Sequence, residues 1–396
     1  MSSQDQDRPY DVVLFGATSF VGALTAAYLA EHAPDTLRWA IAGRDPDKLR
    51  RLRERLAADR PGCADKLPVV RADAADPASL RELAACTRVV ASTVGPYLTH
   101  GRDLVAACAE AGTDYADLTG EPEFVDLMYV RHDARARETG ARLVHACGFD
   151  SVPHDLGVYY TVRQLPQDVP LRVDGFVSVK ARFSGGTFAS ALQQFARGPQ
   201  MLAAARERRR HEPRLADRKA YAPPGAPRYA AEVDAWALPL PTIDPQVVQR
   251  SARALPRYGP DFRYRHYAAV RSLPVALGGV AGVTALFAAA QLPPVRRRLS
   301  GLLKPGEGPD AAQRAAGRFS VRFVGEGGGQ RVFTEVWGGD PGYDETAKIL
   351  AEASMSLALD DLPATAGQVT PAEAMGDALT ARLRGAGVGF RVAARR

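Results

Sequence analysis

The sequence predicts an α/β protein in which a doubly wound parallel sheet is combined with an inserted α+β second domain. A glycine-rich turn stands between a short apolar strand and a helix close to the N-terminus. Strand-like and helix-like segments then alternate as far as residue 146, which is typical of βαβ units that build a parallel sheet. Beyond Pro153 the strand-like runs become longer and the alternation stops, so we expect a second architecture there.

Each element predicted for the first domain follows from its local pattern. Apolar runs rich in β-branched residues indicate strands at 11–15, 39–42, 68–70, 88–93, 115–118 and 142–146. Segments with helical apolar spacing indicate helices at 23–31, 46–57, 77–85, 103–111 and 122–139. We therefore assign the first domain to residues 1–152.

The second domain is assigned to residues 153–344. Its longest strand-like runs are 171–183 and 318–337, and the second run is interrupted by a glycine-rich hairpin signal. The segment 345–396 is expected to complete the first domain. Thr370 opens a capping box in this segment, and we expect the helix that follows to pack back on the first domain.

Composition narrows the classes of protein to consider. The 396 residues are 46% hydrophobic and 24% charged, which is typical of a soluble globular chain of two to three domains. The net charge is +6, but no nucleic-acid-binding motif accompanies it, so nucleic acid is not expected as a partner. The four cysteines are far apart, which predicts neither a metal site nor a disulfide framework and favours a cytoplasmic location. The polar N-terminus lacks the apolar core of a secretory signal.

The glycine-rich turn predicts a dinucleotide-binding site of the Rossmann type, because it follows a strand, opens a helix and belongs to a βαβ unit. Gly16 would allow the tight turn, and Gly22 would let the helix pack close to the strand. Ser19 stands where a third glycine often occurs and is expected to add a hydroxyl donor near the pyrophosphate. The cofactor-binding residues expected here are Gly16, Thr18, Ser19, Phe20, Val21 and Gly22.

The end of the second strand favours NADP over NAD. NAD sites place a carboxylate there for the ribose 2′-hydroxyl, whereas this chain has Gly43 and Arg44, with Lys48 one turn further on. A guanidinium can bind a 2′-phosphate through two parallel hydrogen bonds. The alternative for Arg44 is a solvated side chain near a helix start. Asp73, after the third strand, is predicted as an adenine-side contact or as an ordinary residue before a helix.

Two further strand ends are expected at the carboxyl edge of the sheet, where the nicotinamide half of the cofactor would lie. One follows the fourth strand and the other follows the sixth strand, which leads into the second domain. The additional cofactor-binding residues predicted at these ends are Thr93, Val94, Gly95, Pro96, Gly148, Phe149 and Asp150.

Several motifs together resemble the saccharopine dehydrogenase-like oxidoreductases, and within them the trans-acting enoyl reductase subfamily. The resemblance depends on GATSFVG (16–22), AGR (42–44), VGPY (94–97), GTDYADLTGEPEF (112–124), CGFDSVPHDLG (147–157), SGGT (184–187) and TPAEAMGDALTARLRGAG (370–387). It implies an NADPH-dependent reductase acting on a lipid-like enoyl substrate held on a carrier of a polyketide or lipid synthase. The chain departs from the family pattern at Ser19 and at His154, so His154 is interpreted as a polar residue near the domain hinge rather than a catalytic acid.

Enoyl reduction needs a hydride, a donor to the developing enolate oxygen, and a proton for the α-carbon. No Tyr-x-x-x-Lys occurs in the chain, so the proton relay of short-chain dehydrogenases is absent. The candidate donors are Tyr97, Ser151, Ser184 and Thr187. We predict Tyr97 and Ser151 as catalytic residues, with Tyr97 favoured; its alternative is a ring packed beside the nicotinamide. Glu121 precedes a helix start, where a carboxylate is stabilised without any catalytic role.

Two other functions remain open from the sequence. One is a saccharopine-type reductase or dehydrogenase that acts on an imine of an amino acid. The other is a membrane-associated protein that binds a nucleotide without turnover. The second depends on the uncharged run 272–295, which is flanked by Arg296, Arg297 and Arg298.

The uncharged run has three interpretations. Its high content of alanine and glycine disfavours a membrane span. It is predicted either as a helix that is buried or lies at a homodimer interface, or as an interfacial hairpin. The hairpin would bring 272–298 against anionic lipid, at the inner face of the plasma membrane.

Overall fold

The computed structural model describes residues 8–59, 67–181, 196–292, 295 and 309–395. The chain divides into two compact units. The first unit comprises residues 1–148 and 343–383, and the second comprises residues 149–342 and 384–396.

The first unit is built on a parallel sheet with the order β14-β6-β5-β4-β1-β2-β3. Its strands are β1 (Tyr10–Phe15), β2 (Trp39–Gly43), β3 (Val69–Arg71), β4 (Thr87–Ser92), β5 (Asp114–Asp117), β6 (Arg142–Val144) and β14 (Gly367–Val369). The central strands β1, β2 and β4 are buried almost throughout, as expected of a parallel sheet covered on both faces. The predicted doubly wound sheet is confirmed.

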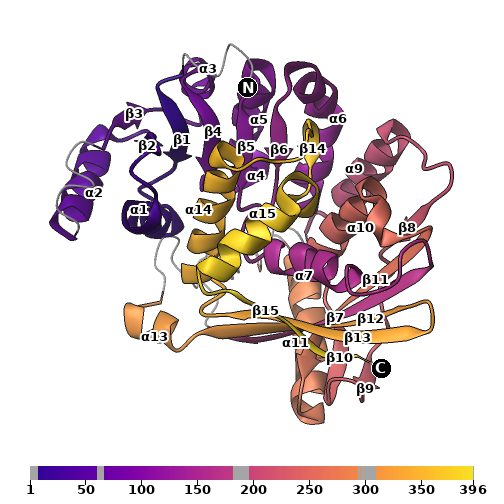
Figure 1. Cartoon of the computed structure of the whole chain (residues 1–396). Helices are drawn as coiled ribbons and strands as arrows, with labels where there is room; N and C mark the ends of the chain where they lie inside the picture. The colour runs from indigo at the N-terminus through magenta and orange to yellow at the C-terminus, as the bar shows by residue number, and fades with distance from the viewer. Residues whose placement is uncertain (1–7, 60–66, 182–195, 293–294, 296–308, 396) are drawn as a thin grey trace. The chain divides into compact units, whose positions relative to one another are not determined.

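Helices cover both faces of this sheet (Figure 1). They are α1 (Phe20–His32), α2 (Pro46–Asp59), α3 (Pro77–Ala85), α4 (Tyr97–His100), α5 (Arg102–Ala111), α6 (Pro122–Thr139), α14 (Asp344–Leu359) and α15 (Pro371–Gly385). Helix α1 packs against α2 and α14, while α5 packs against α3 and α6. The chain order reverses between β1 and β4, and such a switch point is where open α/β sheets bind ligands.

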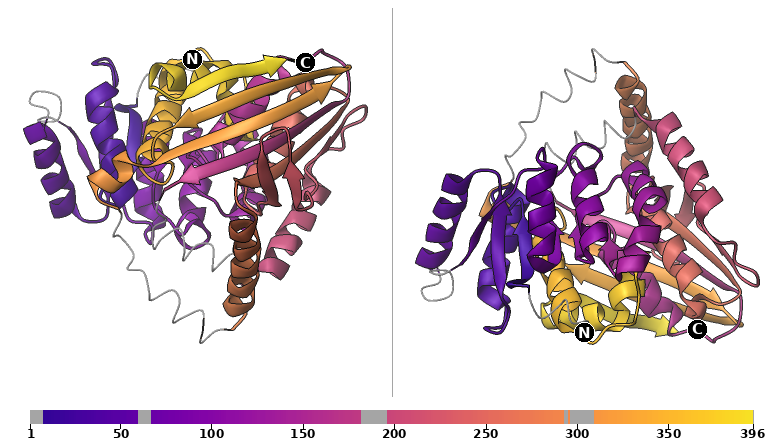
Figure 2. Two further views of the ribbon diagram at one scale, coloured as in Figure 1. Left: turned by 90° about the horizontal axis from the view of Figure 1, so that it is seen from below. Right: turned by 90° about the horizontal axis from the view of Figure 1, so that it is seen from above.

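The second unit is built on a mixed sheet with the order β15-β13-β12-β7-β11-β10-β9, and β8 also pairs with β11. Its strands are β7 (Leu171–Lys180), β8 (Lys219–Tyr221), β9 (Arg228–Ala230), β10 (Ala235–Pro239), β11 (Asp261–Val270), β12 (Arg318–Gly327), β13 (Gln330–Gly338) and β15 (Gly389–Arg395). Strands β12 and β13 form the long hairpin predicted from the glycine run (Figure 2). The predicted α+β character of this part is confirmed.

The helices of the second unit are α7 (Val152–Val162), α9 (Gly198–His211), α10 (Asp244–Ala254), α11 (Leu273–Ala290) and α13 (Ala311–Ala315), with a 3₁₀ turn at Pro256–Tyr258. Helix α7 packs against β7, β12 and β13, and α10 packs against α7 and β11. On the sheet, an apolar cluster gathers around Phe176, Tyr267 and Val324, which occupy neighbouring strands.

The C-terminal strand departs from the sequence prediction. The segment 345–396 was expected to complete the first domain as a whole, but β15 pairs with β13 in the second sheet. The physical reason lies in the alternation of side chains along β15, where Phe390 is buried and Arg391 is exposed. This alternation fits the edge of a sheet with one covered face.

The uncharged run forms one helix, α11, rather than a hairpin, as far as residue 290. It contacts β10 and β11 (Figure 2). Val275 and Leu277 are each 62% exposed, so the helix is not buried within the chain as one interpretation required. The flanking residues Arg296, Arg297 and Arg298 lie outside the described residues. Within the described residues, no helix is long and apolar enough to cross a membrane.

Candidate functional site

The turn between β1 and α1 requires glycine at both predicted positions. Gly16 has a φ of +84°, and a Cβ there would lie 2.6 Å from Cγ2 of Val94. A Cβ at Gly22 would lie 2.2 Å from the carbonyl oxygen of Gly16. At both positions the neighbouring atoms lie too close to admit a side chain, as in glycine-rich turns that bind dinucleotides. The turn lies at the switch point between β1 and β4.

Ser19 has a structural role at the start of α1. Its Oγ caps α1 by accepting from the N–H of Gly22 at 3.0 Å, and it lies 3.0 Å from Oγ1 of Thr93. The hydroxyls of Ser19 and Thr93 are hydrogen-bonded to each other, and either one can be the donor, while the Thr93 hydroxyl also lies 2.9 Å from the carbonyl oxygen of Gly16. The contact of the Ser19 hydroxyl to a pyrophosphate stays a prediction.

The anion-binding capacity of the turn lies in the backbone at the start of α1. The first N–H groups of a helix have no acceptor within the helix, and the helix dipole favours an anion beside them. Phe20 and Val21 are the first two residues of α1, and the side chain of Thr18 is exposed next to them in sequence. This geometry fits a pyrophosphate held by main-chain donors.

The end of β2 carries the residues that favour NADP. Gly43 is buried, whereas Arg44 is exposed and forms no hydrogen bond or ion pair within the described part of the chain. Lys48 lies 3.9 Å from Asp45, whose Oδ1 accepts from the N–H groups of Asp47 and Lys48. The nearby carboxylate is therefore engaged in capping α2, and the guanidinium of Arg44 is available to a phosphate.

Asp73 also serves its own backbone. Its Oδ1 accepts from the N–H of Ala75 at 3.0 Å, and its own N–H donates to Oγ of Ser79. These contacts shape the approach to α3, in keeping with the alternative interpretation from the sequence. The adenine contact stays a prediction.

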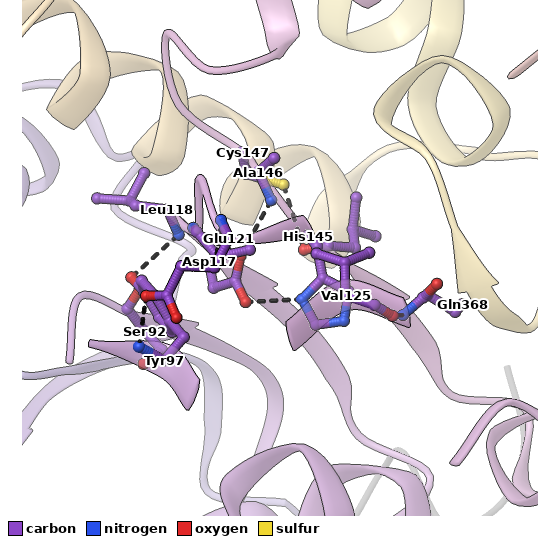
Figure 3. Close-up of polar contacts among 12 residues, drawn as sticks. Ser92, Tyr97, Asp117, Leu118, Glu121, Val125, His145, Ala146, Cys147 and Gln368 are labelled. Atoms are coloured by element: carbon purple, nitrogen blue, oxygen red, sulfur yellow. Dashed lines mark hydrogen bonds and ion pairs between the residues drawn. The ribbon is translucent and has the colours of Figure 1, made fainter. Parts of the chain in front are cut away.

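Tyr97 is buried at the start of α4, the short helix that follows β4 (Figure 3). Its hydroxyl donates to the carbonyl of Ser92 at 3.0 Å and accepts from the N–H of Leu118 at 3.1 Å. The side chain is buried, and this burial raises the pKa of Tyr97 well above its usual range. Since the one phenolic proton is held by Ser92, the arrangement does not support the predicted donation to an enolate.

Glu121 holds the short helix that contains Tyr97. Its two carboxylate oxygens accept from the N–H groups of Tyr97 at 2.8 Å and Leu98 at 3.0 Å. Burial raises the pKa of Glu121, while the two backbone donors oppose the rise. From the sequence, Glu121 was expected to be stabilised at the start of α6 without a catalytic role; its side chain makes no capping hydrogen bond to α6 and instead caps α4.

Sequence reasoning missed a buried pair at the same edge of the sheet. Oδ2 of Asp117, at the end of β5, lies 2.7 Å from Nδ1 of His145, which follows β6 (Figure 3). Oδ1 of Asp117 accepts from the N–H groups of Thr119 and Ala146, each at 3.0 Å. An acidic residue and a histidine that end adjacent parallel strands were the available signal. The pair ties together the loops that follow β5 and β6.

The remaining predicted residues follow β4 or lie where the chain passes from the first unit to the second. Gly95 and Pro96 are exposed, as a nicotinamide contact would require, and Gly148 ends the first unit. Phe149 is half-buried and Asp150 is exposed in the second unit. Ser184 and Thr187 lie outside the described residues.

Ser151 precedes α7 and is completely buried. Its Oγ has no hydrogen-bond partner among the described residues, so its proton remains available. Of the two predicted catalytic residues, Ser151 is the one whose hydroxyl the structure leaves unengaged in this way. Its catalytic role stays a prediction.

A basic groove of about 580 Å³ lies on the sheet of the second unit. Arg318, Ser320 and Arg322 alternate along β12, and the register pairs Arg318 with Lys180 and Ser320 with Ser178. Because alternate residues of a strand share one face, the cationic groups of Arg318, Arg322 and Lys180 gather there. Arg271 adds a fourth. Such a groove can bind a phosphate group.

The fold and the glycine-rich turn between β1 and α1 define a dinucleotide-binding oxidoreductase. Comparison with known proteins identifies the family within this class. Residues 12–144 match the saccharopine dehydrogenase NADP binding domain. A candidate trans-acting enoyl reductase of Mycobacterium tuberculosis is 40% identical, over 96% of this chain and 97% of its own. A trans-acting enoyl reductase of Mycobacterium ulcerans is 35% identical over the same shares.

The solved structure of saccharopine dehydrogenase (L-Glu forming) from Saccharomyces cerevisiae has the same fold, with a TM-score of 0.55 and 12% identity over 97% of this chain and all of that one. The two full-length relatives from Mycobacterium are more similar in sequence, at 40% and 35% identity. The chain belongs to the trans-acting enoyl reductase family of saccharopine dehydrogenase-like oxidoreductases. It is an NADP-dependent oxidoreductase, which confirms the cofactor predicted from the sequence.

Proposed function

We propose that this chain reduces the carbon–carbon double bond of a lipid-like or polyketide enoyl thioester, bound to a carrier and presented in trans by a polyketide synthase. The observation that carries the proposal is the match to trans-acting enoyl reductases over 96% of the chain. A match of this extent includes the second unit, where a substrate-specific part of the protein is expected.

The residues of the chain bind and orient rather than supply the electrons. Bound NADPH provides the hydride for the β-carbon of the substrate, and a proton reaches the α-carbon to complete the saturated thioester. The start of α1 would hold the pyrophosphate, and Arg44 would hold the 2′-phosphate. Tyr97 and Glu121 would keep the loop after β4 in place beside the nicotinamide.

The basic groove is suited to a substrate that carries a phosphate group. A carrier protein holds its acyl group through a pantetheine arm with one phosphodiester, and in coenzyme A the same pantetheine arm ends in a diphosphate. Arg318 and Arg322 offer the planar, charged donors that suit a phosphate. Glu335 also lines the groove, but it already accepts from Ser320 and Arg391.

The test is turnover of an unsaturated thioester with NADPH. We expect consumption of NADPH and a product heavier by two hydrogens, with deuterium from labelled NADPH found only at the β-carbon. Binding of NADPH without oxidation by any thioester would overturn the proposal in favour of a nucleotide-binding protein. Oxidation of NADPH by an amino acid with a 2-oxo acid, but not by thioesters, would favour the saccharopine-type alternative.

The groove gives a separate prediction. The double variant Arg318→Gln and Arg322→Gln should raise KM about tenfold for a thioester of coenzyme A or of a carrier protein, because two charge-assisted contacts are lost. KM should stay within about twofold for a thioester of N-acetylcysteamine, which has no phosphate. An equal rise for both substrates would contradict phosphate recognition.

Contact with a membrane and formation of a homodimer stay predictions.

A further inference from the structure

The second unit holds a buried cluster of metal-ligand side chains that the proposed reaction does not use. His154 lies in the first turn of α7, Asp244 opens α10, and His266 lies in β11. Their side chains are between 1% and 2% exposed. We propose that these three residues form a binding site for a divalent transition-metal ion such as Zn²⁺.

The distances within the cluster suit a small cation. One ligand atom from each residue can be chosen so that all three lie within 4.8 Å of one another. Nδ1 of His154 lies 3.0 Å from Oδ1 of Asp244, and Nε2 of His266 lies 3.4 Å from Oδ2 of Asp244. Bonds of about 2.0–2.1 Å to a tetrahedral zinc ion place donor atoms roughly 3.3 Å apart. The cluster is therefore close to the required spacing.

The atoms that face one another make no contact of hydrogen-bond geometry among the described residues; this holds for Nδ1 and Nε2 of His154, Oδ1 of Asp244 and Nε2 of His266, all of which are buried. Nδ1 of His154 and Nε2 of His266 face the Asp244 carboxylate at ion-pair distance instead. Buried polar atoms are nearly always hydrogen-bonded, and each exception needs an explanation such as an ion. A metal ion would satisfy one nitrogen of each histidine and the carboxylate at the same time.

Neighbouring hydroxyl groups orient two of the three ligands. The hydroxyl of Tyr264 lies 2.8 Å from Nδ1 of His266, which leaves Nε2 as the ligand atom. The hydroxyl of Thr242 donates to Oδ2 of Asp244, which leaves Oδ1 for an ion. Metal-binding histidines usually have their second nitrogen held in this way.

The donor set decides between classes of ion. Two imidazoles and one carboxylate favour Zn²⁺ and its transition-metal neighbours over Mg²⁺ or Ca²⁺, which prefer oxygen ligands. Three protein ligands leave at least one coordination position for another group. Because the ligands come from α7, α10 and β11, the ion would also hold these three elements together.

The first experiment uses the untagged full-length protein. It is stripped with a chelator, dialysed and titrated with ZnCl₂, and the bound metal is measured by mass spectrometry. We expect about one equivalent per chain and a higher Tm in the loaded protein, because the ion binds the folded state. Cobalt in place of zinc should give the strong visible absorption of a four-coordinate ion. Binding no greater than that of a metal-free buffer control would overturn the proposal.

Three variants locate the site. His154→Gln, Asp244→Asn and His266→Gln should each weaken zinc binding at least tenfold, because each removes one of three ligands. Tyr264→Phe should weaken it less, since it frees the orientation of His266 alone. His145→Gln is the matched control, as His145 is also a buried histidine beside an aspartate, in the first unit. Equal zinc binding in the three ligand variants and the control would overturn the assignment.

Discussion

The exposed guanidinium of Arg44, at the end of β2, is expected to determine the preference for NADPH over NADH. Arg44→Glu places a carboxylate where the 2′-phosphate of NADPH is expected to lie, so the affinity for NADPH should fall at least tenfold. The affinity for NADH should change by less than about threefold, because NADH has no 2′-phosphate. Titration of nucleotide fluorescence measures both. Arg55→Glu, the same charge change at an exposed position of α2, is the control.

The hydroxyl of Tyr97 gives a second prediction for a single residue. Tyr97→Phe leaves the carbonyl of Ser92 and the N–H of Leu118 buried without their partner. The free energy of unfolding should therefore fall by about 1–3 kcal/mol. With the loop still in place, kcat should change by less than about threefold. A loss of kcat near a hundredfold, with unchanged stability, would restore the donor role predicted from the sequence.

The predictability of single residues depends on how local their role is. The need for Gly16 and Gly22 arises within one turn of chain, so the sequence indicated both. The roles of Ser19 and Tyr97 depend on partners that come from other strands, Thr93 for the first and Leu118 for the second. No local pattern contains those partners. The hydroxyl groups were therefore predicted as ligand donors although the fold uses them itself.

At the scale of elements, the exposed apolar side chains of α11 separate the interpretations of the uncharged run. Val275→Ser combined with Leu277→Ser should change the free energy of unfolding by less than about 0.5 kcal/mol, because both side chains are 62% exposed. Ala276→Leu, at the buried position between them, should cost about 1–3 kcal/mol by overpacking. Urea denaturation measures the free energy of unfolding of both variants.

A larger loss for the double variant would mean that another surface covers α11. Size-exclusion chromatography and sedimentation with anionic vesicles, at low and high salt, identify that surface. A smaller oligomer in the variant would indicate a second copy of the chain. Loss of salt-sensitive pelleting would indicate lipid.

The strands of the βαβ alternation and the long hairpin were predicted from the sequence, whereas the short strands β8 and β9 and the edge strand β15 were not. The hairpin β12–β13 was indicated by its glycine turn, and the parallel strands by their apolar runs. Strands β8 and β9 have three residues each and lie outside the alternation of strands and helices, which is what indicated the equally short strands β3 and β6. Strand β15 was missed because Phe390 is its one buried residue, so that the segment resembles an exposed tail.

At the scale of the whole molecule, the C-terminal residues belong to the second unit. Phe390 is 4% exposed and its ring centroid lies 5.9 Å from that of Tyr160 in α7. Phe390→Ala should lower the free energy of unfolding by about 3–5 kcal/mol through the cavity that it leaves. Arg395→Ala, at an exposed position of the same strand, should cost less than about 0.5 kcal/mol. Similar losses in denaturant titrations of the two variants would contradict this packing.

The first unit is assembled from two stretches of chain separated by the 194 residues from 149 to 342. Ribosomes add about 5–20 residues per second, so α14 is synthesised roughly 10–40 s after β6 has emerged. During that interval the nascent sheet lacks the helix that packs against β1, β4 and β5, and the apolar side chains beneath it meet water. Until residue 359 has been added, this face of the sheet is therefore the part of the first unit most open to association with other chains.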